Sequence, residues 1–181
     1  MPIRPFEQYI PKIHHTAFVD DTAVVVGDVE IGEDSSIWPL CVIRGDINSI
    51  YIGARTNIQD GTIIHVTHSS RFCQGGQSTT IGNDVTVGHR AILHACTIED
   101  FCLIGMGAIV MDKAVLRHRI IIGAGSLVPP GKLLESGFLY VGSPVKQARL
   151  LNQHELEFLE YSTHNYQILK NRYSSMLVQP L

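Results

Sequence analysis

Three histidines, His65, His89 and His94, are the residues of this 181-residue chain whose type and spacing could do chemistry. Neutral imidazoles are good ligands for Zn²⁺, and three of them leave a fourth tetrahedral position open for water. Water bound there has a pKa of about 7 and so supplies hydroxide at neutral pH. His89 and His94 are five residues apart, which puts them on opposite faces of a strand and out of line on a helix. Whether the three meet therefore depends on the elements that position them.

The sequence has a period of six residues. Aliphatic residues recur at this interval, with a three-residue slip after Ile43, a longer break after Ile64 and a one-residue deletion after Leu93. Period six fits neither an amphipathic helix nor an alternating strand, but it fits short strands joined by tight corners and stacked as a parallel β-helix. A chance run would not fill eighteen such positions, which are Ile13, Val19, Val25, Ile31, Ile37, Ile43, Ile52, Ile58, Ile64, Ile81, Val87, Leu93, Ile98, Ile104, Val110, Leu116, Ile122 and Val128.

This period resembles the hexapeptide-repeat superfamily. The resemblance implies a left-handed parallel β-helix in which three hexapeptides make one triangular coil, whereas general connection rules favour the right hand. We assign the glycines that often follow the aliphatic position to turn backbone at the corners; they are Gly32, Gly53, Gly82, Gly88, Gly105 and Gly123. The predicted fold class is an all-β solenoid with a C-terminal α-helix.

Two segments interrupt the repeat within what we expect to be one domain. Residues 1–143 form the β-helix, with a polar loop insertion at 66–80, and residues 144–181 carry a helix that packs on the prism. Asn152 and Glu155 have the spacing of a capping box at the start of this helix. An apolar stripe at helical spacing follows, made of Leu156, Leu159, Tyr166, Leu169 and Tyr173.

The repeat allows the histidines to be stacked. His65 and His94 each follow the aliphatic residue of their hexapeptide, and 29 residues separate them, which is one eighteen-residue coil plus eleven. If the 66–80 loop supplies the eleven, the two rings lie on one corner in adjacent coils, roughly 4.8 Å apart. The same count places Arg44 in this column, one coil below His65.

His89 belongs to a different column, in which its stacked partner is Asp60. Five residues of strand span roughly 16 Å, so His89 and His94 of one chain should not share a metal ion. We therefore predict that His89 of a neighbouring subunit completes the site of His65 and His94. A metal site at each interface of a three-sided prism suggests a homotrimer with cyclic symmetry. The alternative for any one of these histidines is a structural or exposed side chain.

The composition excludes several classes of function. Apolar residues make up 45% of the chain and charged residues 17%, and the net charge is −3, so no basic surface argues for nucleic acid or an anionic membrane. No apolar run is long enough to span a membrane, and the N-terminus lacks the apolar segment of a signal peptide. The four cysteines show no metal-binding spacing, which favours free thiols in the cytoplasm.

The stretch "RGD…NIQDGTIIH…VGHRAILHACTI", with the closing segment "VGSPVKQ", resembles the γ-class carbonic anhydrases and their close bacterial relatives. The resemblance extends from about Ile13 to Tyr173. It implies that His65, His89 and His94 bind Zn²⁺, with Fe²⁺ or Co²⁺ as alternatives. It implies that the chain is a lyase that reversibly hydrates CO₂ to bicarbonate through metal-bound hydroxide.

The same resemblance assigns roles to further residues. Arg44, Asp46 and Asp60 match a buried charge cluster at the trimer interface, where the alternative is a purely structural salt bridge. Gln59 matches the residue that orients the hydroxide, and Asn57 one proposed to hold substrate oxygen; either amide could instead form a corner.

The C-terminal helix of those enzymes brings a Tyr and an Asn near the metal. The segment "THNYQIL" offers His164, Asn165 and Tyr166 for these places, in a register that the sequence does not fix.

Two departures from the family bear on turnover. Ile47 stands where well-characterised members have an acidic proton shuttle, and the 66–80 loop contains no carboxylate. His68 is an alternative shuttle, since the ordinary pKa of histidine is ~6.5, and a solvated loop histidine is the other interpretation. Two other functions therefore stay open: a non-catalytic or weakly active metal-binding protein, and an acyltransferase that uses a coenzyme A thioester.

Overall fold

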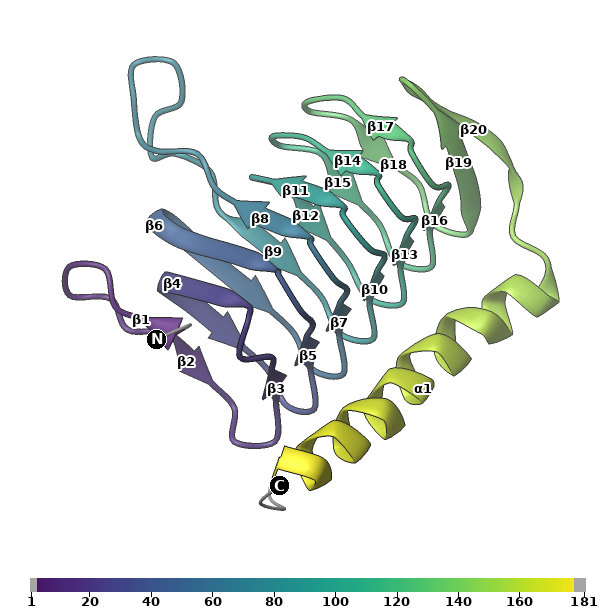
Figure 1. The fold of residues 1–181 in the computed structure, drawn as a ribbon. Helices are drawn as coiled ribbons and strands as arrows, with labels where there is room; N and C mark the ends of the chain where they lie inside the picture. Colours follow the sequence, from purple (N-terminus) through teal and green to yellow (C-terminus); the bar gives the residue numbers. More distant parts are fainter. Residues whose placement is uncertain (1–2, 178–181) are drawn as a thin grey trace.

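The computed structural model describes residues 3–177, and parallel strands stack along one axis with a single helix beside them (Figure 1). The predicted β-solenoid with a C-terminal helix is confirmed. The strands are β1 (Ile3–Arg4), β2 (Lys12–Ile13), β3 (Phe18–Val19), β4 (Val24–Ile31), β5 (Ser36–Ile37), β6 (Val42–Ile52), β7 (Asn57–Ile58), β8 (Ile63–His65), β9 (Thr79–Ile81), β10 (Thr86–Val87), β11 (Ile92–His94), β12 (Thr97–Ile98), β13 (Leu103–Ile104), β14 (Ile109–Val110), β15 (Val115–Leu116), β16 (Ile121–Ile122), β17 (Leu127–Val128), β18 (Leu133–Leu134), β19 (Phe138–Gly142) and β20 (Val145–Leu150).

The strands make three faces of a prism. The first face is the run β6-β8-β11-β14-β17, and the second is β6-β9-β12-β15-β18; β6 bends around the corner and belongs to both. The third face is β3-β5-β7-β10-β13-β16-β19-β20. The named strands of the described chain pair in parallel, except β19 with β20. The period of six therefore gives one strand per face.

The aliphatic positions of the repeat form the core in three columns. On the first face, Ile43, Ile64 and Leu93 are register partners, and all three are fully buried. Burying such a side chain contributes about 1.5–3 kcal/mol each. All eighteen predicted positions point inward, and only the first two, Ile13 and Val19, are partly exposed. The predicted core is confirmed.

The glycines after the aliphatic positions do not serve the turn backbone to which the sequence analysis assigned them. Turn backbone at the corners is adopted instead by non-glycine residues such as Asp34, Arg55 and Asp84, which have positive φ. Gly53 has no positive φ, but a Cβ built on it would lie 2.6 Å from the carbonyl carbon of Gly82 in the next coil. These glycines are needed because adjacent coils approach too closely for a side chain.

The 66–80 insertion forms an arm that projects beyond the prism between β8 and β9 (Figure 1). Backbone bridges pair Thr67 with Gln77 and Ser70 with Cys73, so the arm folds back on itself. Its predicted end was too late, because Thr79 and Thr80 already belong to β9 and continue the second face.

The C-terminal region begins with a strand. The sheet continues past the predicted boundary at residue 143, because β20 turns back along β19 and covers the end of the third face. The helix, α1 (Gln153–Leu177), starts only then, and residues 178–181 of the predicted segment lie outside the described residues. The capping box is confirmed: the Glu155 amide donates to Asn152 Oδ1, and the Asn152 amide to Glu155 Oε2, each at 2.9 Å.

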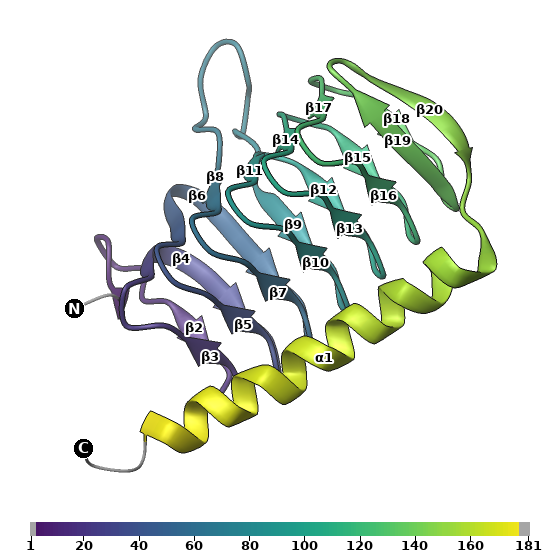
Figure 2. The same cartoon turned by 45° about the vertical axis from the view of Figure 1, so that its right-hand side comes forward.

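Helix α1 lies across the strands of the third face (Figure 2). Its apolar stripe packs on the prism as predicted: Leu159 is buried, and Trp38 meets the rings of Tyr166 and Tyr173 edge-on at 5.5 and 5.1 Å between centroids. No helix in the described part of the chain is both long and apolar enough to cross a membrane.

Candidate metal site

His65 and His94 lie side by side at the same corner of the prism. They end β8 and β11, and they are direct register partners in the parallel pairing of these strands. His65 Nδ1 and His94 Nε2 face each other at 3.3 Å. The structure therefore has the stacking of His65 on His94 that the sequence predicts. The arm after His65 takes up the extra residues between the two coils, so the strands β8 and β11 stay in register.

The other nitrogen of each of these two rings lies within hydrogen-bond distance of a carboxylate. His65 Nε2 is 3.2 Å from Asp46 Oδ1, and His94 Nδ1 is 3.0 Å from Asp112 Oδ2. Because an ionised carboxylate only accepts, these contacts favour hydrogen on His65 Nε2 and His94 Nδ1, and in neutral rings the lone pairs of the other two nitrogens would then face each other. Two nitrogens on one tetrahedral Zn²⁺ at ~2.0–2.1 Å are about 3.3 Å apart. The pair therefore fits two of the ligands of such an ion.

The charge around His65 agrees with a neutral ligand. Burial lowers the pKa of His65, because it penalises the imidazolium form. Burial alone raises the pKa of Asp46, but hydrogen bonds from Arg44 and His65 outweigh it and leave that pKa below its usual range. Arg44 Nη1 is 2.6 Å from Asp46 Oδ2, and the Arg44 side chain is about half exposed (46%). Arg44 thus reaches the site through Asp46 and keeps a free side toward solvent.

Asp112 is a site residue that sequence reasoning missed. Its Oδ1 accepts a hydrogen bond from the hydroxyl of Thr67, at the base of the arm, while its Oδ2 faces His94. Burial alone raises the pKa of Asp112, and these two hydrogen bonds bring it below the usual range. The signal was present, since Asp112 follows His94 by eighteen residues, one full coil.

His89 lies at another corner, where the third face meets the first. Its Nδ1 is 2.9 Å from Asp60 Oδ2, and both side chains are close to half exposed. Asp60 is the stacked partner that the repeat predicted. Residues 3–177 of the single chain contain no group of three or more His, Cys, Asp or Glu side chains placed to hold one metal ion.

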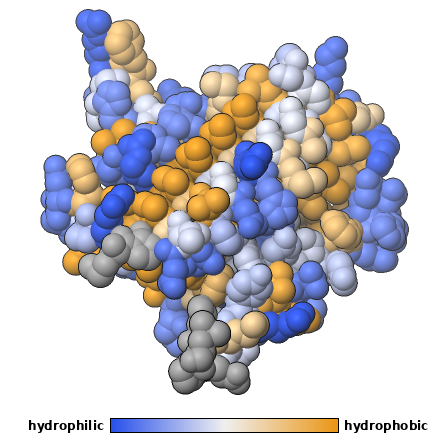
Figure 3. Space-filling view, viewed as in Figure 1, coloured by the Kyte–Doolittle hydropathy of each residue, from blue (hydrophilic) through white to orange (hydrophobic). Residues whose placement is uncertain are grey.

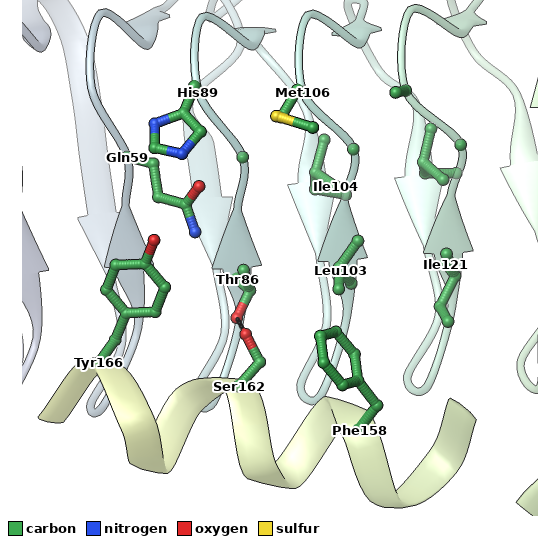
Figure 4. A pocket seen from close by; sticks show the side chains of 15 residues that line it. Gln59, Thr86, His89, Leu103, Ile104, Met106, Ile121, Phe158, Ser162 and Tyr166 are labelled. Atoms are coloured by element: carbon green, nitrogen blue, oxygen red, sulfur yellow. Dashed lines mark hydrogen bonds between the residues drawn. The ribbon is translucent and has the colours of Figure 1, made fainter. Parts of the chain in front are cut away.

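Gln59 and Tyr166 gather beside His89 at one end of a groove between the third face and α1 (Figure 4). Gln59 donates from Nε2 to Asn57 Oδ1 at 3.1 Å, and the buried Asn57 donates to Thr86 Oγ1 at 2.9 Å. Burial and then the charge of Asp60 raise the pKa of Tyr166, so its hydroxyl stays protonated at neutral pH. The helix register that the sequence left open is thus one in which Tyr166 reaches the groove.

The rest of the groove is mostly apolar, and the whole groove has a volume of about 460 Å³. Figure 4 shows Leu103, Ile104 and Ile121 on the prism side, with Phe158 opposite them on α1. Its walls suit a small apolar molecule, while its polar end carries an amide, an imidazole and a phenol.

An apolar band runs along the outside of the first face, between the His89 corner and the His65 corner. Its side chains precede the buried aliphatic positions in register, and Ile63 and Ile92 are 44% and 37% exposed. A hydrophobic band of this kind crosses the surface in Figure 3. The aligned residues are Val42, Ile63, Ile92, Ile109 and Leu127.

Ile47, which stands in place of the family's acidic proton shuttle, and His68, the alternative shuttle, are both exposed. Ile47 is 43% exposed, in the stretch of β6 that follows Asp46, and His68 is exposed at the base of the arm. His68 makes none of the side-chain hydrogen bonds found in the described chain.

The fold and the histidine pair define a class: a hexapeptide-repeat β-solenoid with two stacked imidazoles at one corner. No protein-family model matches the sequence. The chain is 52% identical to Protein YrdA of Escherichia coli over 171 residues, which cover 94% of the chain and 93% of that protein. It is 40% identical to mitochondrial gamma carbonic anhydrase 1 of Arabidopsis thaliana over 94% of the chain, and it spans 62% of the length of that protein.

Solved structures agree with these relatives. A hexapeptide transferase family protein of Anaplasma phagocytophilum superposes with a TM-score of 0.87 at 40% identity, over 94% of the chain and 97% of that structure. The chain belongs to the γ-class carbonic anhydrase-like group of the hexapeptide-repeat superfamily. The left-handed β-helix implied by the resemblance is the fold of this superfamily.

Proposed function

We propose that this protein is a zinc-dependent, γ-class carbonic anhydrase-like lyase that reversibly hydrates CO₂ to bicarbonate at the interfaces of a homotrimer. The observation that carries the proposal is that His65 Nδ1 and His94 Nε2 face each other at 3.3 Å, while aspartates contact the opposite nitrogen of each ring. With hydrogen on the opposite nitrogens, neither ring donates to the space between His65 Nδ1 and His94 Nε2, so two lone pairs can bind a cation there.

The trimer is proposed because each chain carries two incomplete half-sites. His65 and His94 supply two ligands at one corner, and His89 stands at another with Gln59 and Tyr166. The apolar band on the first face lies between these corners, and exposed bands of this kind commonly mark contact surfaces. A neighbour seated on it brings His89 of the partner subunit to the histidine pair.

A bound Zn²⁺ ion would lower the pKa of water to about 7 and so would supply a nucleophile at neutral pH. The neutral imidazoles preserve the full charge of the ion, and Fe²⁺ or Co²⁺ accepts the same donor set. Gln59, whose Nε2 is held by Asn57, retains its carbonyl oxygen as an acceptor that orients the nucleophile. The apolar groove admits CO₂, which carries no net charge.

The proton released by hydration must reach bulk solvent. His68, exposed at the base of the arm, is the side chain that we propose as its carrier, with external buffer as the other route. Arg44 and Asp60 keep exposed faces for an ion pair across the trimer interface, where a bidentate guanidinium–carboxylate contact is strong.

The test is metal analysis of anaerobically purified protein, followed by CO₂ hydration assays with Zn²⁺, Fe²⁺ and Co²⁺. We expect about one ion per chain and activity that is lost in His94→Ala. His154→Ala is the matched control, because His154 is exposed at the start of α1, away from the site. Absence of bound metal, or an unchanged rate in His94→Ala, rejects the proposal.

A second candidate, a metal-binding protein with little or no turnover, is favoured by Ile47 and by the absence of carboxylates in the arm. Tight metal binding without CO₂ hydration across pH and buffer concentration would select it. A coenzyme A-dependent acyltransferase is the third candidate, since the Anaplasma relative is named as a transferase family protein and the groove is apolar. Saturable product formation from acetyl-coenzyme A would select that function.

A further inference from the structure

Each candidate ligand histidine has a nitrogen on its own aspartate. The pairs are His65 with Asp46, His89 with Asp60 and His94 with Asp112, at 3.2, 2.9 and 3.0 Å. The first two aspartates lie in the motifs that carry the family resemblance, whereas Asp112 lies outside them. The role of Asp112 is therefore open, and its second contact is to a residue of the arm, Thr67.

Both oxygens of Asp112 are committed. Oδ2 faces His94 Nδ1, and Oδ1 accepts from the Thr67 hydroxyl. Thr67 is fixed in turn, because its backbone N–H and C=O pair with those of Gln77 at 2.9 Å across the base of the arm. The carboxylate therefore has one orientation, which is set by the arm.

We propose that Asp112, held by Thr67, is a positioning residue that keeps His94 in the tautomer with hydrogen on Nδ1. This inference rests on the proposed metal site. A neutral imidazole has one N–H and one lone pair, and a carboxylate at Nδ1 accepts only if the hydrogen is there. The lone pair of Nε2 then points toward His65, where a metal ion needs it.

A purely structural ion pair is the competing interpretation. The side chains of His94 and Asp112 are 35% and 33% exposed, and exposed charged pairs add little stability because solvent screens them. A positioning role instead changes the histidine tautomer and the metal affinity while the fold stays intact.

The experiment measures the tautomer directly. Long-range ¹H–¹⁵N NMR correlations on metal-free protein, at a pH where the rings are neutral, report which nitrogen of His94 carries the hydrogen. We expect the Nδ1–H form in the wild type and a mixture in Asp112→Ala. Asp112→Asn is the conservative variant: its amide oxygen can still accept from Nδ1, so the Nδ1–H form should persist.

Zinc affinity is the second measurement, by competition with a chelator. Loss of a carboxylate partner typically weakens metal binding 10–100-fold, which is the expected effect of Asp112→Ala. Thr67→Val removes the hydroxyl at similar volume and should give a smaller loss. Asp21→Ala and Thr80→Val are matched controls, since Asp21 is exposed and Thr80 lies on the second face, paired with Thr97.

The outcomes separate this inference from the proposed function. If the wild type binds no zinc but Asp112→Ala shifts the His94 tautomer, the metal proposal fails and the positioning role stands. If Asp112→Ala is folded, by circular dichroism, and leaves the tautomer of His94 unchanged, the positioning role is wrong, whatever the zinc affinity.

Discussion

The Lys170 ammonium of α1 lies 2.9 Å from the Asp34 carboxylate at a corner of the prism, and it is almost completely buried. It also donates to the carbonyl oxygen of Thr16 and to Asn171 Oδ1, at 2.9 and 2.8 Å. The hydrogen bond from Lys170 is the main cause that lowers the pKa of Asp34. One side chain thus anchors the helix that carries Tyr166 into the groove.

Replacing Lys170 by Met should loosen this anchor. The variant keeps the aliphatic stem but removes three charged hydrogen bonds, and the Thr16 carbonyl loses its donor. Because Asp34 is partly exposed and regains water, we expect the free energy of unfolding to fall by about 1–3 kcal/mol in urea denaturation. Lys146→Met, at an exposed position of β20, is the control. Equal stability of the two variants would contradict the anchoring role.

The cap of α1 should respond to acid. The Arg149 guanidinium and the Asn152 amide lower the pKa of Glu155 to about 2, from an ordinary value of 4.5. A depressed pKa means that the carboxylate stabilises the folded helix above pH 4.5 and that this contribution is lost as the pH falls toward 2.

The measurement is amide hydrogen exchange at the start of α1 between pH 5 and 2, corrected for intrinsic rates. Protection should decrease in this window for the wild type and become independent of pH in Glu155→Gln, which has no carboxyl group to titrate. Glu30→Gln, at an exposed position of β4, should behave as the wild type does. A pH dependence that survives in Glu155→Gln would show that another group is responsible.

The features that follow from the six-residue repeat could be predicted from the sequence. A repeat of six with one strand per face forces every aliphatic position into one of three columns, so the core and the pairing of His65 with His94 followed directly. Asp112 is not a candidate ligand of the metal and so was missed, although the same eighteen-residue count reaches it from His94. Gly53 was wrongly assigned to turn backbone, because the close approach of adjacent coils is a tertiary contact that local sequence does not reveal.

Other features of the fold could not be predicted by counting residues along the repeat. The register of Tyr166 depends on how α1 packs against Trp38 and on the ion pair of Lys170 with Asp34, and Trp38 and Asp34 are both remote from α1 in the sequence. The antiparallel strand β20 breaks the period, so the repeat could not indicate it.

An acidic residue at position 47 should speed turnover if proton release is slow. Ile47 is exposed beside the Asp46–His65 corner, where a carboxylate can accept a proton without disturbing a core contact. We expect Ile47→Glu to raise kcat in dilute buffer by roughly 10²-fold, the low end of general-base contributions, and to leave kcat/KM unchanged. Concentrated imidazole buffer should rescue the wild type to a similar kcat. Ile47→Gln, of similar shape and without a titratable carboxyl, is the control; an equal gain in that variant would rule out proton transfer.

Mixing variant subunits tests whether the site is shared between chains. His89→Ala and His94→Ala each disrupt every site of a homotrimer, because each removes one ligand at all three interfaces. In a mixed trimer, one interface pairs the intact His65 and His94 of a His89→Ala chain with the intact His89 of a His94→Ala chain. Random association at equal amounts should therefore restore about one quarter of the wild-type zinc content and CO₂ hydration.

The matched control mixes His65→Ala with His94→Ala. Both changes affect the same half-site, which comes from one chain, so no intact pair forms and no activity should return. Two affinity tags on the variants verify that subunits have exchanged. Exchange without restored zinc binding in the first mixture would show that His89 does not complete the site of a neighbour.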